Sequence, residues 1–204
     1  MSQRDRSPEL TVVERFTTTS ASAVFERELL AYARLRESRR GFVSRVTAAL
    51  TDRPGAYVHL DWWSGLDRLL RVIHEDPPHG PRGLPDTVSA ESELLVSVGR
   101  MTVSGTPAEA ARLVLIRALV LDEAARFELD FGSLVGQCVP HDGFGGSDLL
   151  RSVADPSVYI GLLWWQDPTA CALTLSGAAY RDHYAKLAAT SRTTECRARP
   201  LSPL

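Results

Sequence analysis

The stretch YVHLDWW, residues 57–63, recurs as YIGLLWW at residues 159–165. The two stretches stand 102 positions apart and together contain all 4 tryptophans of the chain. A period of about a hundred residues is too long for a solenoid repeat, so each copy is expected to be a small domain of its own. The same offset repeats Phe25, Glu26, Gly41, Phe42 and Pro54 as Phe127, Glu128, Gly143, Phe144 and Pro156.

Each copy has the pattern of strand, helix, strand, strand, helix, strand. Alternating β-branched residues indicate strands, helical spacing of Phe25, Leu29 and Tyr32 indicates a helix, and Pro54 marks a turn. In the first copy we expect strands at 10–18, 42–50, 56–63 and 93–103 and helices at 23–39 and 66–74. In the second copy we expect strands at 112–120, 144–153, 157–165 and 193–198 and helices at 122–135 and 167–188.

This order of elements is typical of the split βαβ, or ferredoxin-like, fold, whose sheet carries helices on one face. The bare face of one sheet is most simply covered by the bare face of the other. The sequence therefore predicts an α+β protein with two ferredoxin-like βαββαβ repeats, packed sheet to sheet as an intramolecular dimeric α+β barrel. The repeats are expected at residues 8–104 and 108–200, with a linker at 105–107. The proline-rich stretch 74–85 breaks the symmetry and could be a lid.

Composition excludes several classes of function. The net charge is −2 and the 23 Lys and Arg residues form no basic stripe, which argues against a nucleic-acid partner. No run approaches the roughly 20 apolar residues of a membrane helix, and the first residues lack an apolar signal segment. The 3 cysteines are widely spaced and form no CxxC pair, and no helical histidine pair is present, so we predict no metal site. We expect a cytoplasmic protein without a membrane partner.

Alternation along residues 57–63 divides the third strand into two faces. Val58, Leu60 and Trp62 are expected to pack under the helices. The opposite face carries His59 and Asp61 and is expected to border a cavity. The second copy has Gly161 and Leu163 at those positions, so the first copy is predicted to hold the active pocket. The alternative is a solvated strand face without a role.

The chain resembles the antibiotic biosynthesis monooxygenase family. The resemblance rests on Phe-Glu at the start of the first helix, Gly-Phe before the second strand, an acidic residue before proline in the turn, and Tyr-x4-Trp on the third strand. It is clearest over residues 143–172, GFGGSDLLRSVADPSVYIGLLWWQDPTACA.

This resemblance implies oxidation of polycyclic aromatic polyketides, from phenol or anthrone to quinone, with O2 and without a metal or bound cofactor. Tandem members of the family are also associated with oxidative ring opening assisted by a diffusible reduced flavin. The chain departs from the family pattern because it contains no asparagine, a residue that cofactor-free relatives carry four positions before the strand tryptophan. His59 and Gly161 occupy these positions.

Candidate residues follow from these faces. His59 could act as hydrogen-bond donor and base, and Asp61, about 6.5–7 Å along the strand, could raise the pKa of His59 or orient its ring through water. Trp63 completes the predicted catalytic set. The candidate substrate-binding residues are aromatic or lie on one face of the last helix: Tyr57, Trp165, Tyr180 and His183.

Three functions are compatible with these patterns. The leading hypothesis is a cofactor-independent oxygenase that acts on a small aromatic polyketide. The alternatives are a ring-opening oxygenase that uses reduced flavin, and a non-catalytic subunit that binds a ligand or stabilises a polyketide complex. The chain is expected to be a pseudo-dimer by itself, and a further homodimer is left open.

Overall fold

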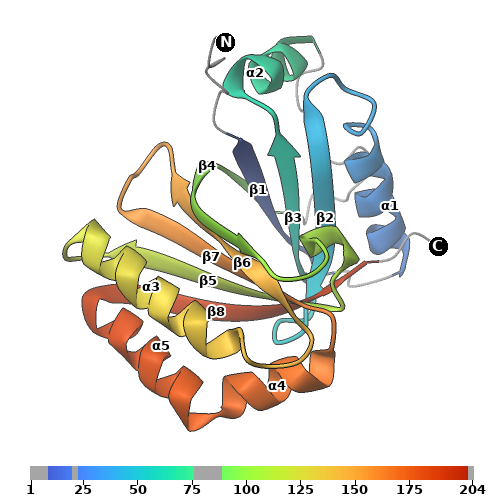
Figure 1. Cartoon of the computed structure of the whole chain (residues 1–204). Helices are drawn as coiled ribbons and strands as arrows, with labels where there is room; N and C mark the ends of the chain where they lie inside the picture. The colour runs from blue at the N-terminus through green and yellow to red at the C-terminus, as the bar shows by residue number, and fades with distance from the viewer. Residues whose placement is uncertain (1–8, 20–22, 76–88, 202–204) are drawn as a thin grey trace, which may run out of the picture.

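The computed structural model describes residues 9–19, 23–75 and 89–201. The predicted order of strand, helix, strand, strand, helix, strand is present in each half (Figure 1). The first half contains β1 (Leu10–Thr17), α1 (Ala23–Arg34), β2 (Phe42–Leu50), β3 (Ala56–Trp63), α2 (Leu66–Glu75) and β4 (Ser89–Thr102). After the short helix η1 (Pro107–Glu109), the second half contains β5 (Arg112–Val120), α3 (Ala124–Cys138), β6 (Phe144–Ser152), β7 (Val158–Trp165), α4 (Pro168–Ser176), α5 (Ala178–Thr190) and β8 (Ser191–Pro200).

A few boundaries differ from the sequence prediction. The helix expected at 167–188 is divided into α4 and α5, because Gly177 between them has extended backbone angles of φ −66° and ψ 147°. Helix α1 ends at Arg34, five residues before the predicted end. Most of the segment proposed as a lid lies outside the described residues. No helix in the described ranges is long and apolar enough to cross a membrane.

The strands close into one antiparallel barrel with the order β1-β3-β2-β8-β5-β7-β6-β4. The two halves meet at β4–β6, which is paired over seven residue positions, and at β2–β8, which is paired over three. The strands of the two halves pair in the same register at positions 102 residues apart. Leu10 lies opposite Trp63, and Arg112 lies opposite Trp165. The β4–β6 junction is therefore the more extensive contact between the halves.

The interior of the barrel is one apolar core shared by both halves. It has members from all eight strands and none from helices α1 to α5. The prediction that the Val58, Leu60 and Trp62 face packs under the helices is wrong, because this face points into the barrel. The surrounding strands line that space mostly with apolar side chains, so the more apolar face of β3 is buried there.

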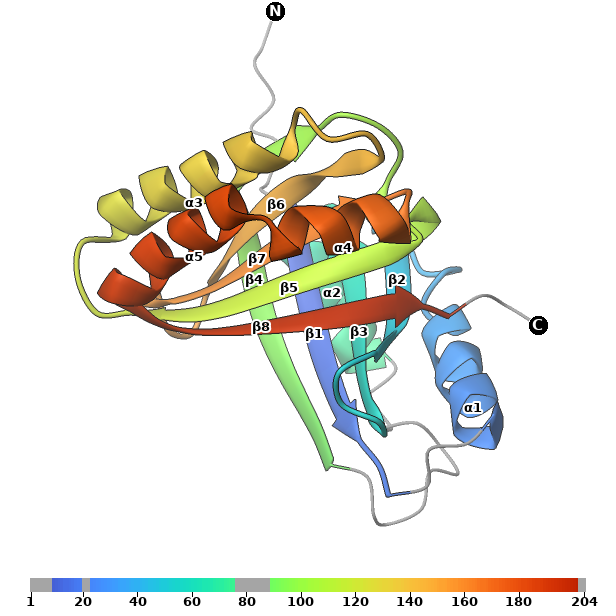
Figure 2. The same cartoon turned by 90° about the horizontal axis from the view of Figure 1, so that it is seen from below.

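Helices cover the outside of the barrel. Figure 2 shows α3 and α5 side by side over the sheet of the second half, while α1 lies against β2 and β3 on the other side. The core under α3, α4 and α5 is one large cluster of buried apolar residues. The first half has two smaller clusters, one under α1 and one that includes Leu69 of α2. The side chains of His59 and Asp61 lie on this helix-covered face.

The repeated residues make repeated contacts between helix and sheet. In each half a Phe of the first helix packs on the Tyr of the third strand, whose hydroxyl donates to a Glu of that helix. The ring-centroid distances are 4.8 Å for Phe25–Tyr57 and 5.1 Å for Phe127–Tyr159. The hydroxyl-to-carboxylate distances are 3.5 Å for Tyr57–Glu26 and 2.8 Å for Tyr159–Glu128. These repeated residues hold the helices on the barrel.

The two halves fill the space beside the third strand in different ways. In the first half, Leu29 of α1 leaves room for His59. In the second half, the larger Phe131 stands at the position of Leu29, and glycine stands at the position of His59. A Cβ atom added to Gly161 would lie 2.2 Å from Cε2 of Phe131. The side chains at these two positions are therefore complementary in volume.

This complementarity predicts that Gly161→Ala destabilises the protein by about 1–3 kcal/mol, since added atoms overpack a filled core. Adding Phe131→Leu should recover part of that loss, because the shorter side chain vacates the space. Urea unfolding of the single and double variants measures both effects. Gly136→Ala is the control, because an added Cβ there meets nothing within 4 Å. A Gly161→Ala variant as stable as the control would contradict the complementarity.

Candidate functional site

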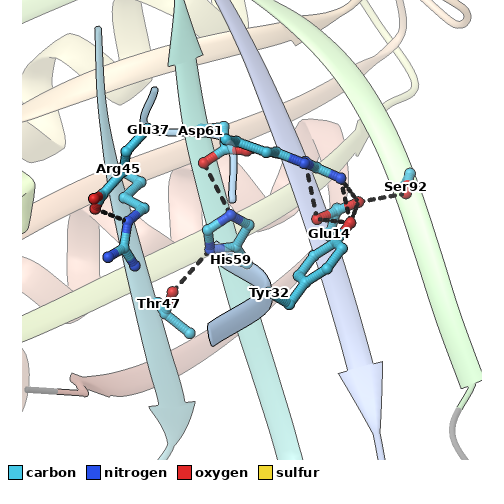
Figure 3. Close-up of polar contacts among 9 residues, drawn as sticks. Glu14, Tyr32, Glu37, Arg45, Thr47, His59, Asp61 and Ser92 are labelled. Atoms are coloured by element: carbon cyan, nitrogen blue, oxygen red, sulfur yellow. Dashed lines mark hydrogen bonds and ion pairs between the residues drawn. The ribbon is translucent and has the colours of Figure 1, made fainter. Parts of the chain in front are cut away.

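A network of polar side chains lies beneath α1 in the first half (Figure 3). β3 contributes His59 and Asp61, both with 0% exposure. Glu14 stands directly opposite His59 on β1 and is 6% exposed. The other members are Thr47 of β2, Tyr32 of α1 and Arg36, which follows the end of α1.

His59 is held by one contact on each ring nitrogen. Its Nδ1 lies 2.8 Å from the Thr47 hydroxyl. Its Nε2 lies at an ion-pair distance of 2.9 Å from Asp61 Oδ1. The expectation that the two side chains are separated by 6.5–7 Å therefore needs correction, because they lean toward each other along the strand.

Arg36 joins the two carboxylates of the network. It donates to Asp61 Oδ2 at 2.9 Å and to Glu14 Oε1 at 3.1 Å. The Tyr32 hydroxyl, which also contacts Arg36, donates to Glu14 Oε1 at 3.0 Å. Burial and the nearby Glu14 charge raise the pKa of Tyr32, so the hydroxyl stays a donor at neutral pH. Charged side chains in this buried region therefore compensate one another.

Opposing effects act on the Asp61 carboxyl. Burial by itself raises its pKa, but the charges of His59 and Arg36 and the hydrogen bond from Arg36 outweigh burial. The pKa of Asp61 therefore falls below its ordinary value of 3.8. Asp61 is ionised across the neutral range.

The second half replaces this network with apolar core. The positions that hold Glu14, Tyr32, Arg36, Thr47, His59 and Asp61 in the first half hold Ile116, Leu134, Cys138, Leu149, Gly161 and Leu163 in the second half. Sequence reasoning found His59 and Asp61 but missed the partners. Two features of the sequence could have indicated these partners. Glu14 is a charged residue within the mostly apolar strand β1, and Arg36 lies one helical turn after Tyr32.

The remaining predicted residues are mostly structural in their contacts. Trp63 and Trp165 are each 0% exposed and pack edge-on against a phenylalanine at the start of the neighbouring strand. Tyr57 lies in the core under α1. Tyr180 donates to Glu195 at 2.8 Å, and burial raises its pKa. Among the described residues, none is a hydrogen-bond partner of Nδ1 in the half-buried His183. The structure does not bring Tyr180 or His183 to His59.

A cavity of about 260 Å³ lies between α3 and β6 of the second half and β4. Since β4 belongs to the first half, the cavity is built from both halves at their longer junction. Most of its lining is apolar or glycine, and Glu128 and Ser147 contribute polar side chains. The lining residues are Val98, Gly99, Arg100, Met101, Glu128, Phe131, Gly132, Val135, Ser147 and Leu149.

Arg100 lines the cavity, but its guanidinium group is bound elsewhere. It donates to Asp148 from Nε at 2.8 Å and from Nη2 at 2.6 Å. Arg100 lies opposite Asp148 on the paired strands, whereas Met101 and Ser147 form the next pair. Because neighbouring residues of a strand alternate in direction, the Arg100–Asp148 pair lies on the other face from Ser147. Burial raises the pKa of Asp148, and the Arg100 and Ser97 contacts only partly oppose this.

Sequence reasoning missed this cavity. Glu128 was recognised as a repeated residue, but its repetition by itself indicates structure rather than a site. The long pairing of β4 with β6, which brings the two halves together here, is a tertiary feature. Among the described side chains, no group of three or more His, Cys, Asp or Glu residues is arranged to hold a metal ion.

The fold is similar to that of several solved structures. A candidate monooxygenase from Fusobacterium nucleatum subsp. nucleatum has a TM-score of 0.74 and 7% identity, over 96% of this chain and 94% of that one. An anthrone oxidase-like protein has a TM-score of 0.71 and 15% identity, over 99% and 94%. A Listeria monocytogenes ferredoxin-fold protein related to antibiotic biosynthesis monooxygenases has a TM-score of 0.57 and 8% identity, over 99% and 100%.

No family model matches the chain, and no curated protein matches its sequence. Because the solved structures share only 7–15% sequence identity with this chain, the similarity establishes a shared fold alone. Because one fold serves many activities, function must be argued from the site.

The ionised Asp61 gives a testable pH dependence. Because its folded-state pKa is lowered, its contribution to stability is present above about pH 3.8 and is lost as the pH falls through the folded-state value. Asp61→Asn should cost about 3–5 kcal/mol at pH 7, since it removes the buried charge that Arg36 and His59 face. Urea unfolding between pH 7 and pH 3 should show the difference shrinking in acid. A difference independent of pH would contradict the assignment.

Proposed function

We propose that the chain is an oxygenase that converts a compact polycyclic aromatic polyketide from phenol or anthrone to quinone, with O2 as co-substrate and without a bound metal or cofactor. In the anthrone case, one ring carbon loses two hydrogen atoms and gains one oxygen atom. The second atom of O2 leaves with those hydrogens as water. The substrate supplies the electrons, and the protein supplies a mostly apolar pocket for it.

The cavity between α3, β4 and β6 is the observation that carries this proposal. Small-molecule sites are mostly apolar hollows with a few placed polar groups, and this cavity has that composition. Its volume of about 260 Å³ is slightly below the ~300–1,000 Å³ of sites for drug-sized ligands, which favours a compact substrate. Phe131 provides an aromatic ring against which a planar ring system can pack.

The solved structures of the same fold support the reaction class. They include a candidate monooxygenase and an anthrone oxidase-like protein. We also infer that the two halves, residues 8–104 and 108–200 with a linker at 105–107, are fused counterparts of two subunits of a dimeric α+β barrel. The matching register of β1–β3 and β5–β7 supports this inference.

A chemical role for His59, Asp61 and Trp63 stays a prediction. All three have 0% exposure in the described structure. A substrate would reach His59 or Asp61 only if α1 moved away from the sheet. The proposal therefore places the substrate in the cavity of the second half and gives the buried network the role of holding α1.

Oxygen consumption by the purified protein tests the proposed activity. With an anthrone as substrate, we expect uptake of one O2 per anthrone and formation of the anthraquinone. Uptake only in the presence of reduced flavin would replace the proposal with the flavin-assisted alternative. Saturable anthrone binding without uptake under either condition would support a non-catalytic binding protein and overturn the proposal.

Blocking the cavity tests where the substrate binds. Gly132→Leu should reduce anthrone turnover at least tenfold, because residue 132 lines the cavity and the added side chain would narrow it. Gly136→Leu, one turn along α3, is the matched control and should retain turnover, since residue 136 does not line the cavity. Added Cβ atoms at both glycines meet nothing within 4 Å, so both variants should fold. Loss of turnover in His59→Ala combined with full turnover in Gly132→Leu would instead place the reaction in the first half.

A further inference from the structure

We propose that Glu128 is the base of this cavity, that Ser147 donates a hydrogen bond to the oxygen that becomes anionic, and that the site selects neutral hydroxylated aromatic ligands over carboxylated ones. The roles of Glu128 as base and of Ser147 as donor rest on the proposed oxygenase function. The selectivity of the site for neutral ligands follows from the cavity alone.

Glu128 is positioned by the sheet. The Tyr159 hydroxyl donates to Glu128 Oε1 at 2.8 Å, and within the described structure Oε2 has no hydrogen-bond partner. Burial and the contact with Glu128 raise the pKa of Tyr159 to about 12, so this hydroxyl remains a donor in the neutral range. Tyr159 therefore fixes one oxygen of the carboxylate and leaves the other available at the cavity.

Ser147 provides a second polar group without a protein partner. Its side chain is 3% exposed and lines the cavity, and its hydroxyl forms no hydrogen bond within the ranges that the structure describes. The hydroxyl oxygen is not among the fully buried side-chain atoms that lack a partner, so it can be reached from the cavity and can bond a ligand there. A hydroxyl can donate to a ligand oxygen that gains negative charge.

The charges of the lining set the ligand class. The Arg100 charge is paired with Asp148 on the other face of the sheet, so Glu128 contributes the unpaired charge of the cavity lining. Among the described residues that line the cavity, the paired Arg100 is the only cationic one, so an anionic ligand would face the like charge of Glu128, which is unfavourable. A neutral phenol or anthrone instead offers a proton to the carboxylate.

The step proposed for the pair is a proton transfer. The O–H bond of a phenol, or the acidic C–H bond of an anthrone, breaks, and its proton forms a new O–H bond on Glu128 Oε2. The electron pair stays on the ring system and is delocalised onto the oxygen that accepts from Ser147. The resulting anion is the species that reduces O2 in the proposed function.

The preference of the cavity for a neutral over an anionic ligand can be tested by binding alone, without turnover. Two anthraquinones of similar size that do not react with O2 serve as probes, neutral 2-hydroxymethylanthraquinone and anionic anthraquinone-2-carboxylate. We expect the wild-type protein to bind the neutral probe at least tenfold more tightly. Glu128→Gln should remove that preference by tightening binding of the carboxylate, as measured by fluorescence quenching titrations.

Glu26→Gln is the matched control, because Glu26 makes the corresponding contact with Tyr57 in the first half and does not line the cavity. It should keep the wild-type preference. An unchanged preference in Glu128→Gln, or an equal change in both variants, would overturn the assignment even if the protein consumes O2. If the preference changes in Glu128→Gln only and the protein consumes no O2, the binding site is supported. The proposed oxygenase function is then refuted.

Turnover then tests the base itself. Glu128→Gln should lower kcat for anthrone about 10²–10⁴-fold while KM changes little, since a positioned base contributes that much to proton transfer. Ser147→Ala should lower kcat without raising KM. Glu128→Gln with wild-type kcat would overturn the role of Glu128 as base.

Discussion

The structure depends on the burial of apolar strand faces in an interior that belongs to neither half. Trp62 and Trp164 lie in the same buried cluster, together with residues from all eight strands. Neither sheet can cover this face with its own helices, since α1 to α5 lie on the outside. At about 25 cal/mol per Å² of buried apolar surface, a core of this kind is the main force that holds the halves together. The halves therefore stabilise each other by closing the barrel.

Barrel closure also decides where chemistry can occur. The interior is filled mostly by apolar side chains, whereas the cavity and the network around His59 lie in the layer between the sheet and the helices. The two halves have used this layer differently. The first half filled it with a network in which Arg36 joins Glu14 and Asp61, while the second half kept a cavity beside Phe131.

The contrast between the halves has a simple basis in volume and charge. A glycine at 161 lets the Phe131 ring lie against the sheet, and apolar residues elsewhere remove any need for charge compensation. In the first half, His59 and Asp61 occupy that space and must be paired, because unpaired buried charges are costly. The same backbone therefore supports an ionic network on one side and an apolar cavity on the other.

The junction of the halves adds a further asymmetry. β4 continues along β6 for seven paired positions, whereas β2 and β8 share three. The longer junction brings residues 98–101 of the first half under α3 of the second. A cavity at this place has walls from both halves, so neither half could form it alone.

The sequence by itself determined the element order and the α+β class, because strand alternation, helical spacing and the 102-residue offset are local or periodic patterns. It also identified His59 and Asp61 as unusual, since a polar pair inside an apolar strand stands out. Tertiary structure decided which face of β3 is interior, that Arg36 and Glu14 compensate Asp61, and that a cavity forms beside Glu128 and Ser147. The physical reason is that alternation divides a strand into two faces but does not say what covers each. That depends on closure of the barrel and on side chains distant in sequence.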